Sequence, residues 1–133
     1  MGSGDIYRVV EGMYQVEDSV VVDLEALGRE SFMVLFVVPR DGLPLDDRLE
    51  RAIKERIRSD LSPRHVPDAV IAVPAVPRTL NGKKLEVPIR KILLGTPIEQ
   101  AVSADALSNP ESLRFFVAFA RTLNPPPTEL PAM

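Results

Sequence analysis

Apolar residues along the chain follow two different spacings, and their order predicts the first secondary-structure elements. Residues 5–13 and 46–61 carry apolar side chains at every third or fourth position, which is the spacing of one helical face. Residues 19–23, 32–38 and 69–73 are short apolar runs, and the second is continuous enough to predict a strand buried on both faces. The chain therefore begins with the predicted order helix, strand, strand, helix, strand.

Prolines and glycines separate the elements in the second half of the chain. We predict a short extended segment over residues 84–87 and a helix over residues 88–94, with a proline in its first turn and Gly95 just past its end. Asn109 is expected to cap a last helix. The apolar side chains expected on the inward face of that helix are Leu113, Phe116, Val117 and Ala120. This order of elements favours an α+β fold, in which a small sheet is covered by helices.

The composition allows one domain and excludes several kinds of site. With 133 residues and a hydrophobic fraction of 45%, the chain can form one modest hydrophobic core. It has no cysteine and one histidine, His65, so disulfides, a thiol nucleophile and clustered cysteine or histidine metal ligands are excluded. The net charge of −3 argues against a dedicated nucleic-acid binder. No apolar run reaches the length of a membrane span and no signal peptide is evident, so a cytoplasmic location is expected.

Two segments are expected to lie outside the regular elements. Residues 24–31, which contain Gly28, are predicted to be a hairpin-like connection between the first two strands. Four of the 13 prolines lie in residues 124–133, and this tail is expected to be extended and disordered. The folded domain is therefore expected over residues 1–123.

One motif in the chain combines a tight turn with positive charge. Pro77–Lys84 (Pro-Arg-Thr-Leu-Asn-Gly-Lys-Lys) contains an Asn-Gly turn followed by two lysines. A phosphate-binding loop is excluded, because it requires a glycine where Pro77 stands and a serine or threonine where Lys84 stands. The simplest interpretation is a solvated turn with two surface lysines. The alternative is that the rigid frame holds Lys83 as a point charge for a carboxylate or a phosphate.

Basic side chains on the long predicted helix form a second candidate site. Arg51, Lys54 and Arg58 lie at helical spacing, and Arg64 follows just beyond the helix. Acidic residues between them favour an ordinary solvated face. The alternative is a site for an anionic ligand such as a nucleotide phosphate. His65 is expected to be structural or exposed, because as a lone catalytic base it would lack a partner.

Several segments together resemble one protein superfamily. Pro77–Lys83 resembles the last core motif of the adenylate-forming superfamily, which includes acyl-CoA synthetases, peptide-synthetase adenylation domains and luciferases. Gly2–Tyr7 looks like the segment just after the superfamily's hinge, and Leu61–Asp68 resembles the segment before the strand that leads to the lysine loop. Lys84–Leu93 and Ala106–Leu113 look most like acetoacetyl-CoA synthetases. The resemblance covers nearly the whole chain.

The resemblance implies the fold, the reaction and the partners of a small C-terminal lid domain. The fold would be α+β, with a small mixed sheet of about three strands covered by helices. A subfamily-specific helical extension would begin near residue 95. Acetoacetate and ATP would give an acyl-adenylate and pyrophosphate, and CoA would then displace AMP to form the thioester. A large N-terminal adenylation domain, in the same chain or in trans, would bind acetoacetate and ATP, and Mg²⁺ would arrive with ATP.

The same resemblance assigns roles to individual residues. Lys83 takes the position of the family's catalytic lysine, and its charge would bridge the substrate carboxylate and the nucleotide during adenylation. The residues that match the motif around it are Thr79, Asn81 and Gly82. The lid would then rotate and present another face to CoA. Arg58 falls where related acetyl-CoA synthetases place a basic residue near the CoA phosphates, and Gly2 would lie near the pantetheine entrance.

One residue departs from the family pattern, and the family's large domain is not among these residues. Many members have an arginine three residues after the catalytic lysine, where this chain has Glu86. The ATP and acid pockets belong to the large domain, so we predict no adenylation by the isolated chain. An alternative from another functional class is a free-standing binding or regulatory module that keeps the fold without catalysis.

Overall fold

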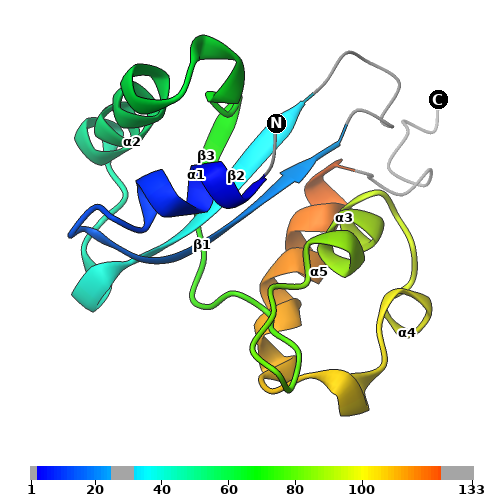
Figure 1. Cartoon of the computed structure of the whole chain (residues 1–133). Helices are drawn as coiled ribbons and strands as arrows, with labels where there is room; N and C mark the ends of the chain where they lie inside the picture. The colour runs from blue at the N-terminus through cyan, green and yellow to red at the C-terminus, as the bar shows by residue number, and fades with distance from the viewer. Residues whose placement is uncertain (1–2, 25–31, 124–133) are drawn as a thin grey trace, which may run out of the picture.

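A three-stranded sheet separates two layers of helices (Figure 1). The structure is a computed structural model, and it describes residues 3–24 and 32–123. Its helices and strands, in chain order, are α1 (Ser3–Val10), β1 (Val16–Asp23), β2 (Met33–Pro39), α2 (Asp47–Asp60), β3 (Ala69–Ala72), α3 (Glu86–Leu93), α4 (Ile98–Ala101) and α5 (Leu113–Leu123). Short 3-10 turns cover Arg40–Gly42, Pro63–His65, Ala104–Ala106 and Pro110–Ser112.

β2 is the central strand, and its two neighbours run in different directions. It pairs antiparallel with β1, where Val21 lies opposite Leu35, and parallel with β3, where Phe36 lies opposite Ile71. The parallel pair needs a crossover connection, and α2 supplies it. The sheet is therefore mixed, and with the helices around it the fold is α+β, as predicted.

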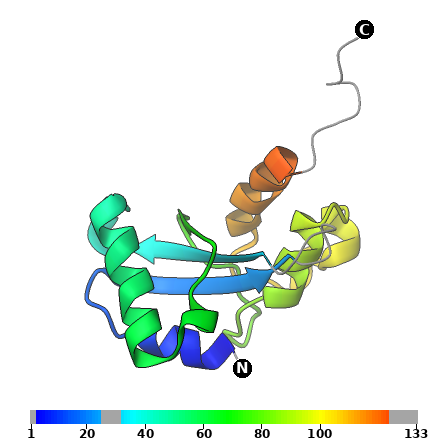
Figure 2. The ribbon, with the colours of Figure 1, turned by 90° about the horizontal axis from the view of Figure 1, so that it is seen from above.

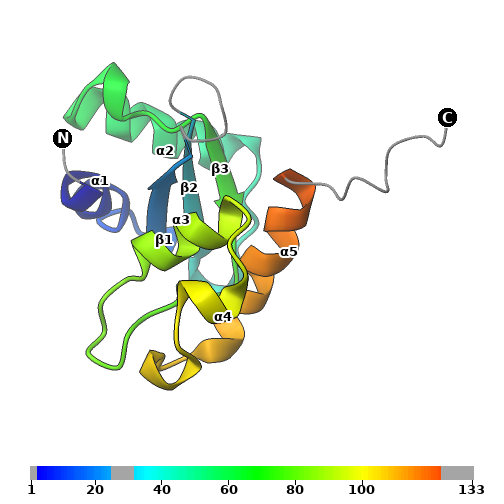
Figure 3. The ribbon, with the colours of Figure 1, turned by 90° about the vertical axis from the view of Figure 1, so that its right-hand side faces the viewer.

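Helices cover both faces of the sheet (Figure 2 and Figure 3). Alternate side chains of β2 enter two separate hydrophobic cores, one on each face. Val34 and Phe36 pack with α3 and α5, whereas Leu35 and Val37 pack with α1 and α2. All four side chains are fully buried. The prediction of a strand buried on both faces is confirmed, and the run is continuous because neither face meets water.

The helix α2 covers one face of the sheet with the apolar stripe that its spacing predicted. Leu49, Ile53 and Ile57 are buried there. Asp46 caps the helix, since its Oδ1 accepts a hydrogen bond of 2.9 Å from the backbone N–H of Leu49. Burial of each of these apolar side chains contributes about 1.5–3 kcal/mol. Packing, more than helix propensity, therefore holds α2 in place.

On the other face, α5 packs aromatic side chains against the central strand. Phe116 lies edge-to-face with Phe36, and 4.9 Å separates the ring centroids. Leu113 and Ala120 are buried with it and Val117 is partly buried, as the spacing predicted. The last part of the described chain therefore completes the core on this face of the sheet.

The first helix and the first strand differ from their predicted boundaries. α1 begins and ends earlier than the predicted residues 5–13, and it closes at Val10. β1 begins at Val16 rather than at residue 19. A β-bulge between Val16 and Asp18 interrupts the alternation of side chains at this end of the strand, so the sequence pattern does not reveal it.

α3 has the predicted proline and glycine signals but begins earlier. Leu85 is buried at its start and the helix begins at Glu86, so the extended segment predicted over residues 84–87 is wrong in its second half. At the other end, Gly95 has a φ of +106°, and the N–H groups of Gly95 and Thr96 donate to helix carbonyls at 3.0 and 2.9 Å. Glycine ends the helix here because it adopts this conformation without strain. The short helix α4 follows, within the stretch where the family resemblance implied a helical extension from about residue 95, although it was not predicted as a separate element.

Three expectations from the sequence concern residues outside the described part of the chain. They are the placement of Gly2, the hairpin-like connection beyond Leu24 and the disordered tail over residues 124–133. They stay predictions, as does the domain boundary at residue 123.

Candidate functional site

The loop between β3 and α3 folds as a small hairpin. Arg78 and Lys84 face each other as an antiparallel bridge at its base. The N–H of Thr79 donates to the carbonyl of Lys83 at 2.8 Å, and the N–H of Gly82 donates to the carbonyl of Thr79 at 2.9 Å. The tight turn predicted at the centre of the motif is therefore confirmed.

Lys83 stands at the exposed tip of this hairpin. Its backbone N–H donates to Oγ1 of Thr79 at 3.0 Å, which fixes the main chain at the lysine. Gly82, directly before it, has a φ of +85°, a conformation that other L residues adopt only with strain. Leu80 and Lys83 are both exposed, and no ion pair of Lys83 occurs within residues 3–24 and 32–123. The hairpin thus presents a cation to solvent from a fixed backbone.

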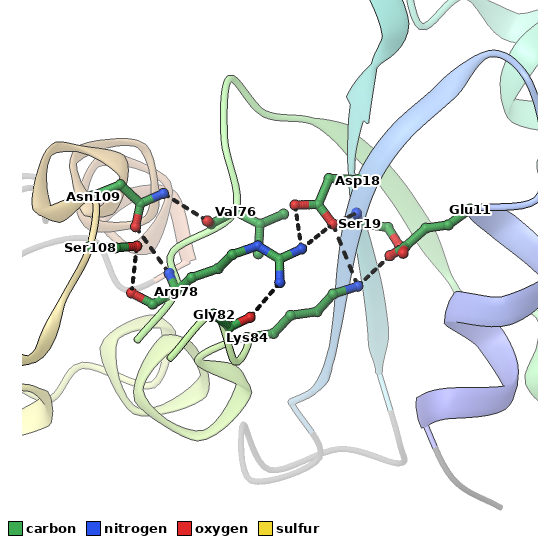
Figure 4. A network of polar contacts seen from close by, with 9 residues as sticks. All are labelled: Glu11, Asp18, Ser19, Val76, Arg78, Gly82, Lys84, Ser108 and Asn109. Atoms are coloured by element: carbon green, nitrogen blue, oxygen red, sulfur yellow. Dashed lines mark hydrogen bonds and ion pairs between the residues drawn. The ribbon is translucent and has the colours of Figure 1, made fainter. Parts of the chain in front are cut away.

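Arg78 ties the hairpin to the first strand of the sheet (Figure 4). Its Nη2 donates to both carboxylate oxygens of Asp18 at 2.7 Å, and its Nη1 donates to the carbonyl of Gly82 at 2.7 Å. Hydrogen bonds between charged groups are about twice as strong as neutral ones. One guanidinium therefore joins β1 firmly to the turn before Lys83.

Lys84 turns into the protein toward Glu11 (Figure 4), whereas Lys83 is exposed. Its Nζ forms ion pairs with the carboxylate of Glu11 and with Oδ1 of Asp18, the latter at 3.6 Å. It also lies over the ring of Tyr7, 3.4 Å from the centroid. Only 14% of the side chain is exposed. The interpretation of two surface lysines is therefore wrong for Lys84, because neighbouring residues on an extended arm face opposite sides.

Glu11 connects Lys84 with a buried side chain of β1. The hydroxyl of Ser19 donates to Oε2 of Glu11 at 2.7 Å, and Ser19 is fully buried. The same carboxylate oxygen accepts from Nζ of Lys84. The segment that follows α1 is therefore joined to both the strand and the hairpin.

Tyr7 and Glu86 form a second link between α1 and the chain after the hairpin. The hydroxyl of Tyr7 donates to the carboxylate of Glu86, and it accepts from the backbone N–H of Val21 at 3.1 Å. Burial raises the pKa of Tyr7, and the hydrogen bond to Glu86 raises it further. Glu86, where the resemblance described above leads us to expect an arginine, therefore has a defined partner in this chain.

Residues 106–109, which precede the last helix, support the hairpin from the other side. Oδ1 of Asn109 accepts from the backbone N–H of Arg78 at 3.0 Å, and Nδ2 donates to the carbonyl of Val76 at 2.9 Å. The N–H of Leu80 donates to the carbonyl of Ala106 at 3.2 Å. The prediction that Asn109 caps the last helix is wrong, because its side chain makes no cap hydrogen bond and is engaged with the hairpin instead.

A β-bulge decides which way Asp18 faces. β1 contains one extra residue, Glu17, between the pairs that Val16 and Asp18 form with β2. Val16 packs in the core under α1 and α2, whereas Val20 packs in the core under α3 and α5. The bulge therefore turns Asp18 to the face where the hairpin lies. Sequence reasoning missed this residue, and the one available signal was an acidic side chain beside an apolar run.

Basic side chains of α2 pair with acidic side chains of the same helix. Arg58 lies 3.0 Å from the carboxylate of Glu55, and Lys54 lies 3.2 Å from that of Glu50. Both pairs join residues three or four positions apart on the helix. In the described part of the chain, no hydrogen bond or ion pair connects Arg58 with the hairpin. This arrangement agrees with a solvated face, the simpler of the two interpretations.

The described residues lack the features of two other kinds of site. Within residues 3–24 and 32–123, no group of three or more His, Cys, Asp or Glu side chains could hold a metal ion. No helix in these ranges is long and apolar enough to cross a membrane. Nδ1 of His65 lies 2.8 Å from the hydroxyl of Ser62, a local contact that fits a structural side chain.

Comparison with known proteins relates the chain to one family. The family model described as AMP-binding enzyme C-terminal domain matches residues 9–83, which is more than half of the chain. An acetoacetyl-CoA synthetase of Macaca fascicularis is 39% identical over 115 residues, 86% of this chain. An acetoacetyl-coenzyme A synthetase of Rhizobium meliloti (strain 1021) is 42% identical over 118 residues, 87% of this chain. Among solved structures, the acetoacetyl-CoA synthetase from Streptomyces lividans is 45% identical, with a TM-score of 0.86 over 92% of this chain.

The similarity covers most of this chain but a small part of each relative. The chain spans 17% of the length of the two curated relatives and 18% of the Streptomyces lividans chain. Its mixed sheet and helices match the C-terminal domain of adenylate-forming enzymes. The chain therefore belongs to the AMP-binding enzyme C-terminal domain family, and it groups with the C-terminal domains of acetoacetyl-CoA synthetase-like adenylate-forming enzymes.

Proposed function

We propose that the chain works as the mobile C-terminal domain of a cytoplasmic acetoacetate–CoA ligase, and that Lys83 supplies the charge for its adenylation step. The observation that carries this proposal is the placement of Lys83, an exposed ammonium on a turn whose backbone is held on both sides. The similarity to acetoacetyl-CoA synthetases supports the reaction and the substrate.

The adenylation step needs positive charge where the acid meets the nucleotide. A carboxylate oxygen of acetoacetate attacks the α-phosphorus of ATP, and pyrophosphate leaves. Both reactants are anionic, so a lysine ammonium between them reduces their repulsion and stabilises the charge that develops in the transition state. Lysine suits this role because its charge is compact and its side chain is long. The large N-terminal domain would bind both substrates, with Mg²⁺ on the phosphates of ATP.

The second step needs the same domain to move. The CoA thiol attacks the carbonyl of the acyl-adenylate, the thiol proton is lost and AMP leaves as the thioester forms. Lys83 has no role in this attack, so rotation of the domain would withdraw it and bring another face to the site. A hairpin that is braced against its own sheet suits such a motion, because the lysine then travels with the domain.

We extend the proposal to the contacts with CoA. Arg58 would contact the CoA phosphates, and Gly2 would lie near the entrance for the pantetheine arm. The pair between Arg58 and Glu55 is exposed and contributes little to stability, so a phosphate can displace the carboxylate. Ser3, the next residue after Gly2, lines a hollow of about 300 Å³ together with residues of β1 and α3.

A chimeric enzyme tests the proposal. This chain replaces the matching C-terminal segment of the Streptomyces lividans synthetase, and the formation of AMP, pyrophosphate and thioester is measured with acetoacetate, ATP and CoA. Lys83→Ala should lower adenylation by about 10²–10³-fold. It should affect thioester formation from preformed acetoacetyl-adenylate much less. Lys91→Ala, which removes an exposed lysine of α3, is the matched control and should change neither step.

Three results would contradict the proposal. The first is full adenylation by the Lys83→Ala chimera, and the second is an inactive wild-type chimera whose large domain still binds ATP. The third comes from the 133-residue chain alone, which we expect to carry out no adenylation. AMP formation by that chain above the level of its own Lys83→Ala variant would show that it does not need a large domain.

A further inference from the structure

Asp18 holds both arms of the lysine hairpin at once (Figure 4). On one arm, its carboxylate accepts two hydrogen bonds of 2.7 Å from Arg78. On the other arm, it pairs with Nζ of Lys84 at 3.6 Å. Its Oδ1 also accepts from the backbone N–H of Ser19 at 2.9 Å, which orients the carboxylate on β1.

These contacts reach the main chain on both sides of Lys83. Arg78, while bound to Asp18, donates to the carbonyl of Gly82, the residue before Lys83. Lys84, the residue after it, is bound to Asp18 directly. Within the described residues Lys83 makes no ion pair with Asp18, so an effect of Asp18 on Lys83 acts through these neighbours.

We propose that Asp18 is a positioning residue, which sets the place of the Lys83 ammonium relative to the sheet. The inference rests on the proposed function of Lys83 in adenylation. A domain that closes over a substrate must bring its lysine to one place, and displacement by about 1 Å is enough to slow a reaction strongly. The tip of the hairpin from Leu80 to Lys83 is exposed, so its order depends on contacts near its base, and the contacts of Asp18 join that base to the sheet.

The balance of charge explains why this anchor needs a carboxylate. Arg78 and Lys84 bring two positive charges to the same end of β1, and Asp18 and Glu11 bring two negative ones. Glu11 pairs with Lys84 and, within the described residues, not with Arg78. Without the charge on Asp18, Arg78 would lose its carboxylate partner and only Glu11 would remain to offset the two cations. Their repulsion would then favour separation of the two arms.

The chimeric enzyme gives the first test. Asp18→Asn should lower adenylation on the order of 100-fold, while thioester formation from preformed acetoacetyl-adenylate changes little. Asp5→Asn is the matched control, because Asp5 forms an exposed ion pair with Arg8, and it should leave both steps unchanged. In a Lys83→Ala background, Asp18→Asn should cause no further loss of adenylation. Equal losses in both half-reactions, or a full additional loss in that background, would indicate a merely structural role and overturn the inference.

A second test does not depend on activity. Amide hydrogen exchange of the 133-residue chain reports on the N–H groups of Thr79, Gly82 and Lys83, which are bonded inside the hairpin. Asp18→Asn should speed their exchange by about tenfold, whereas Lys83→Ala should not. Unchanged exchange would overturn the inference even if activity falls. Faster exchange together with an inactive wild-type chimera would support the anchor and contradict the proposed function instead.

Arg78→Lys serves as a milder variant if Asp18→Asn does not fold. Lysine keeps the positive charge, but it cannot donate to Asp18 and to the carbonyl of Gly82 with the fixed geometry of the guanidinium. Adenylation should fall roughly tenfold, and the thioester step should again change little. Wild-type adenylation in this variant would overturn the inference.

Discussion

The lysine hairpin and the outer face of α2 both carry several cations, but the two regions hold them differently. On α2, Arg58 and Lys54 pair with carboxylates three or four residues away. In the hairpin, Arg78 and Lys84 pair with carboxylates 60 and 73 residues away along the chain. The local pairs would form in an isolated helix, so they carry no information about the fold. The long-range pairs exist only when α1, β1 and the hairpin are assembled.

One pair from each region differs strongly in burial, and this has an energetic consequence. The side chains of Arg58 and Glu55 are 57% and 63% exposed, whereas that of Lys84 is 14% exposed. Exposed pairs contribute about 0–1 kcal/mol, because water competes for both charges. Loss of one member of a buried pair costs more, because the other charge keeps its place away from water without a partner. Loss of a charged side chain should therefore lower the free energy of unfolding more in the hairpin than on α2.

The largest difference is expected between two lysines. Lys84→Met keeps the apolar part of the side chain but leaves Glu11 and Asp18 without a shared cation, so the free energy of unfolding should fall by about 3 kcal/mol. Lys54→Met on α2 should change it by about 0.5 kcal/mol or less. Urea unfolding of both variants measures the two values. Equal losses would remove the distinction between the regions.

An arginine in each region gives the next largest difference. Arg78→Ala should lower the free energy of unfolding by about 2 kcal/mol, because it removes hydrogen bonds to a charged group. Arg58→Ala should leave stability within about 0.5 kcal/mol. In the chimera, Arg58→Ala should raise the KM for CoA if the residue contacts the CoA phosphates. Denaturation and steady-state kinetics separate the two effects, and a greater loss of stability from Arg58→Ala would reverse the comparison.

Alanine substitutions at two glycines test the backbone conformation of the hairpin against that of a helix. Gly82→Ala should destabilise the protein by about 1 kcal/mol, because its φ of +85° strains any residue that has a Cβ. Gly4→Ala on the exposed side of α1 should stabilise it by about 0.5–1 kcal/mol, because alanine favours a helix and the position has open space. Thermal unfolding gives both signs. A stabilising Gly82→Ala would mean that the turn before Lys83 has a different conformation.

The smallest expected effect is a dependence on alkaline pH. Burial and the hydrogen bond to Glu86 raise the pKa of folded Tyr7, whereas an unfolded tyrosine ionises near pH 10. The unfolded state therefore loses its proton first, so the stability due to Tyr7 is intact below about pH 10 and falls as the pH rises further. Tyr7→Phe should flatten this fall in unfolding experiments.

Tyr14 provides the control for that experiment. Its side chain lies on the surface and is 71% exposed, so Tyr14→Phe should leave the alkaline fall as it is in the wild type. If Tyr7→Phe also leaves the alkaline fall unchanged, the hydrogen bond between Tyr7 and Glu86 does not govern it.

The main helices, strands and turns could be predicted from the sequence, because the patterns that indicate them involve residues close together in the chain. The spacing of Leu49, Ile53 and Ile57 predicts α2, and the continuous apolar run from residue 32 predicts the buried strand β2. The Asn-Gly dipeptide likewise predicts the tight turn before Lys83. In each case the residues that carry the signal are neighbours in the chain, so no knowledge of the packing is needed.

The contacts around Lys83 could not be predicted from the sequence in this way. No sequence pattern singles out Asp18, the residues around Asn109 favour a helix cap, and the Asn-Gly turn favours exposure of both lysines that follow it. The partners of these side chains lie 31 to 73 residues away in the chain. The bulge at Glu17 added a further difficulty, since it changes which side of the sheet a residue faces without a clear mark in the sequence.

Local sequence patterns are enough to establish the types and order of the main elements, the family to which the chain belongs and the presence of a lysine on a tight turn. The packing of the whole chain is needed to show that Lys83 meets solvent while Lys84 is mostly buried, that Asp18 faces the hairpin and that Asn109 supports it. Local patterns are set by the geometry of a single helix, strand or turn. Ion pairs and buried hydrogen bonds depend on low exposure to water and on close approach, and both arise only when distant segments pack together.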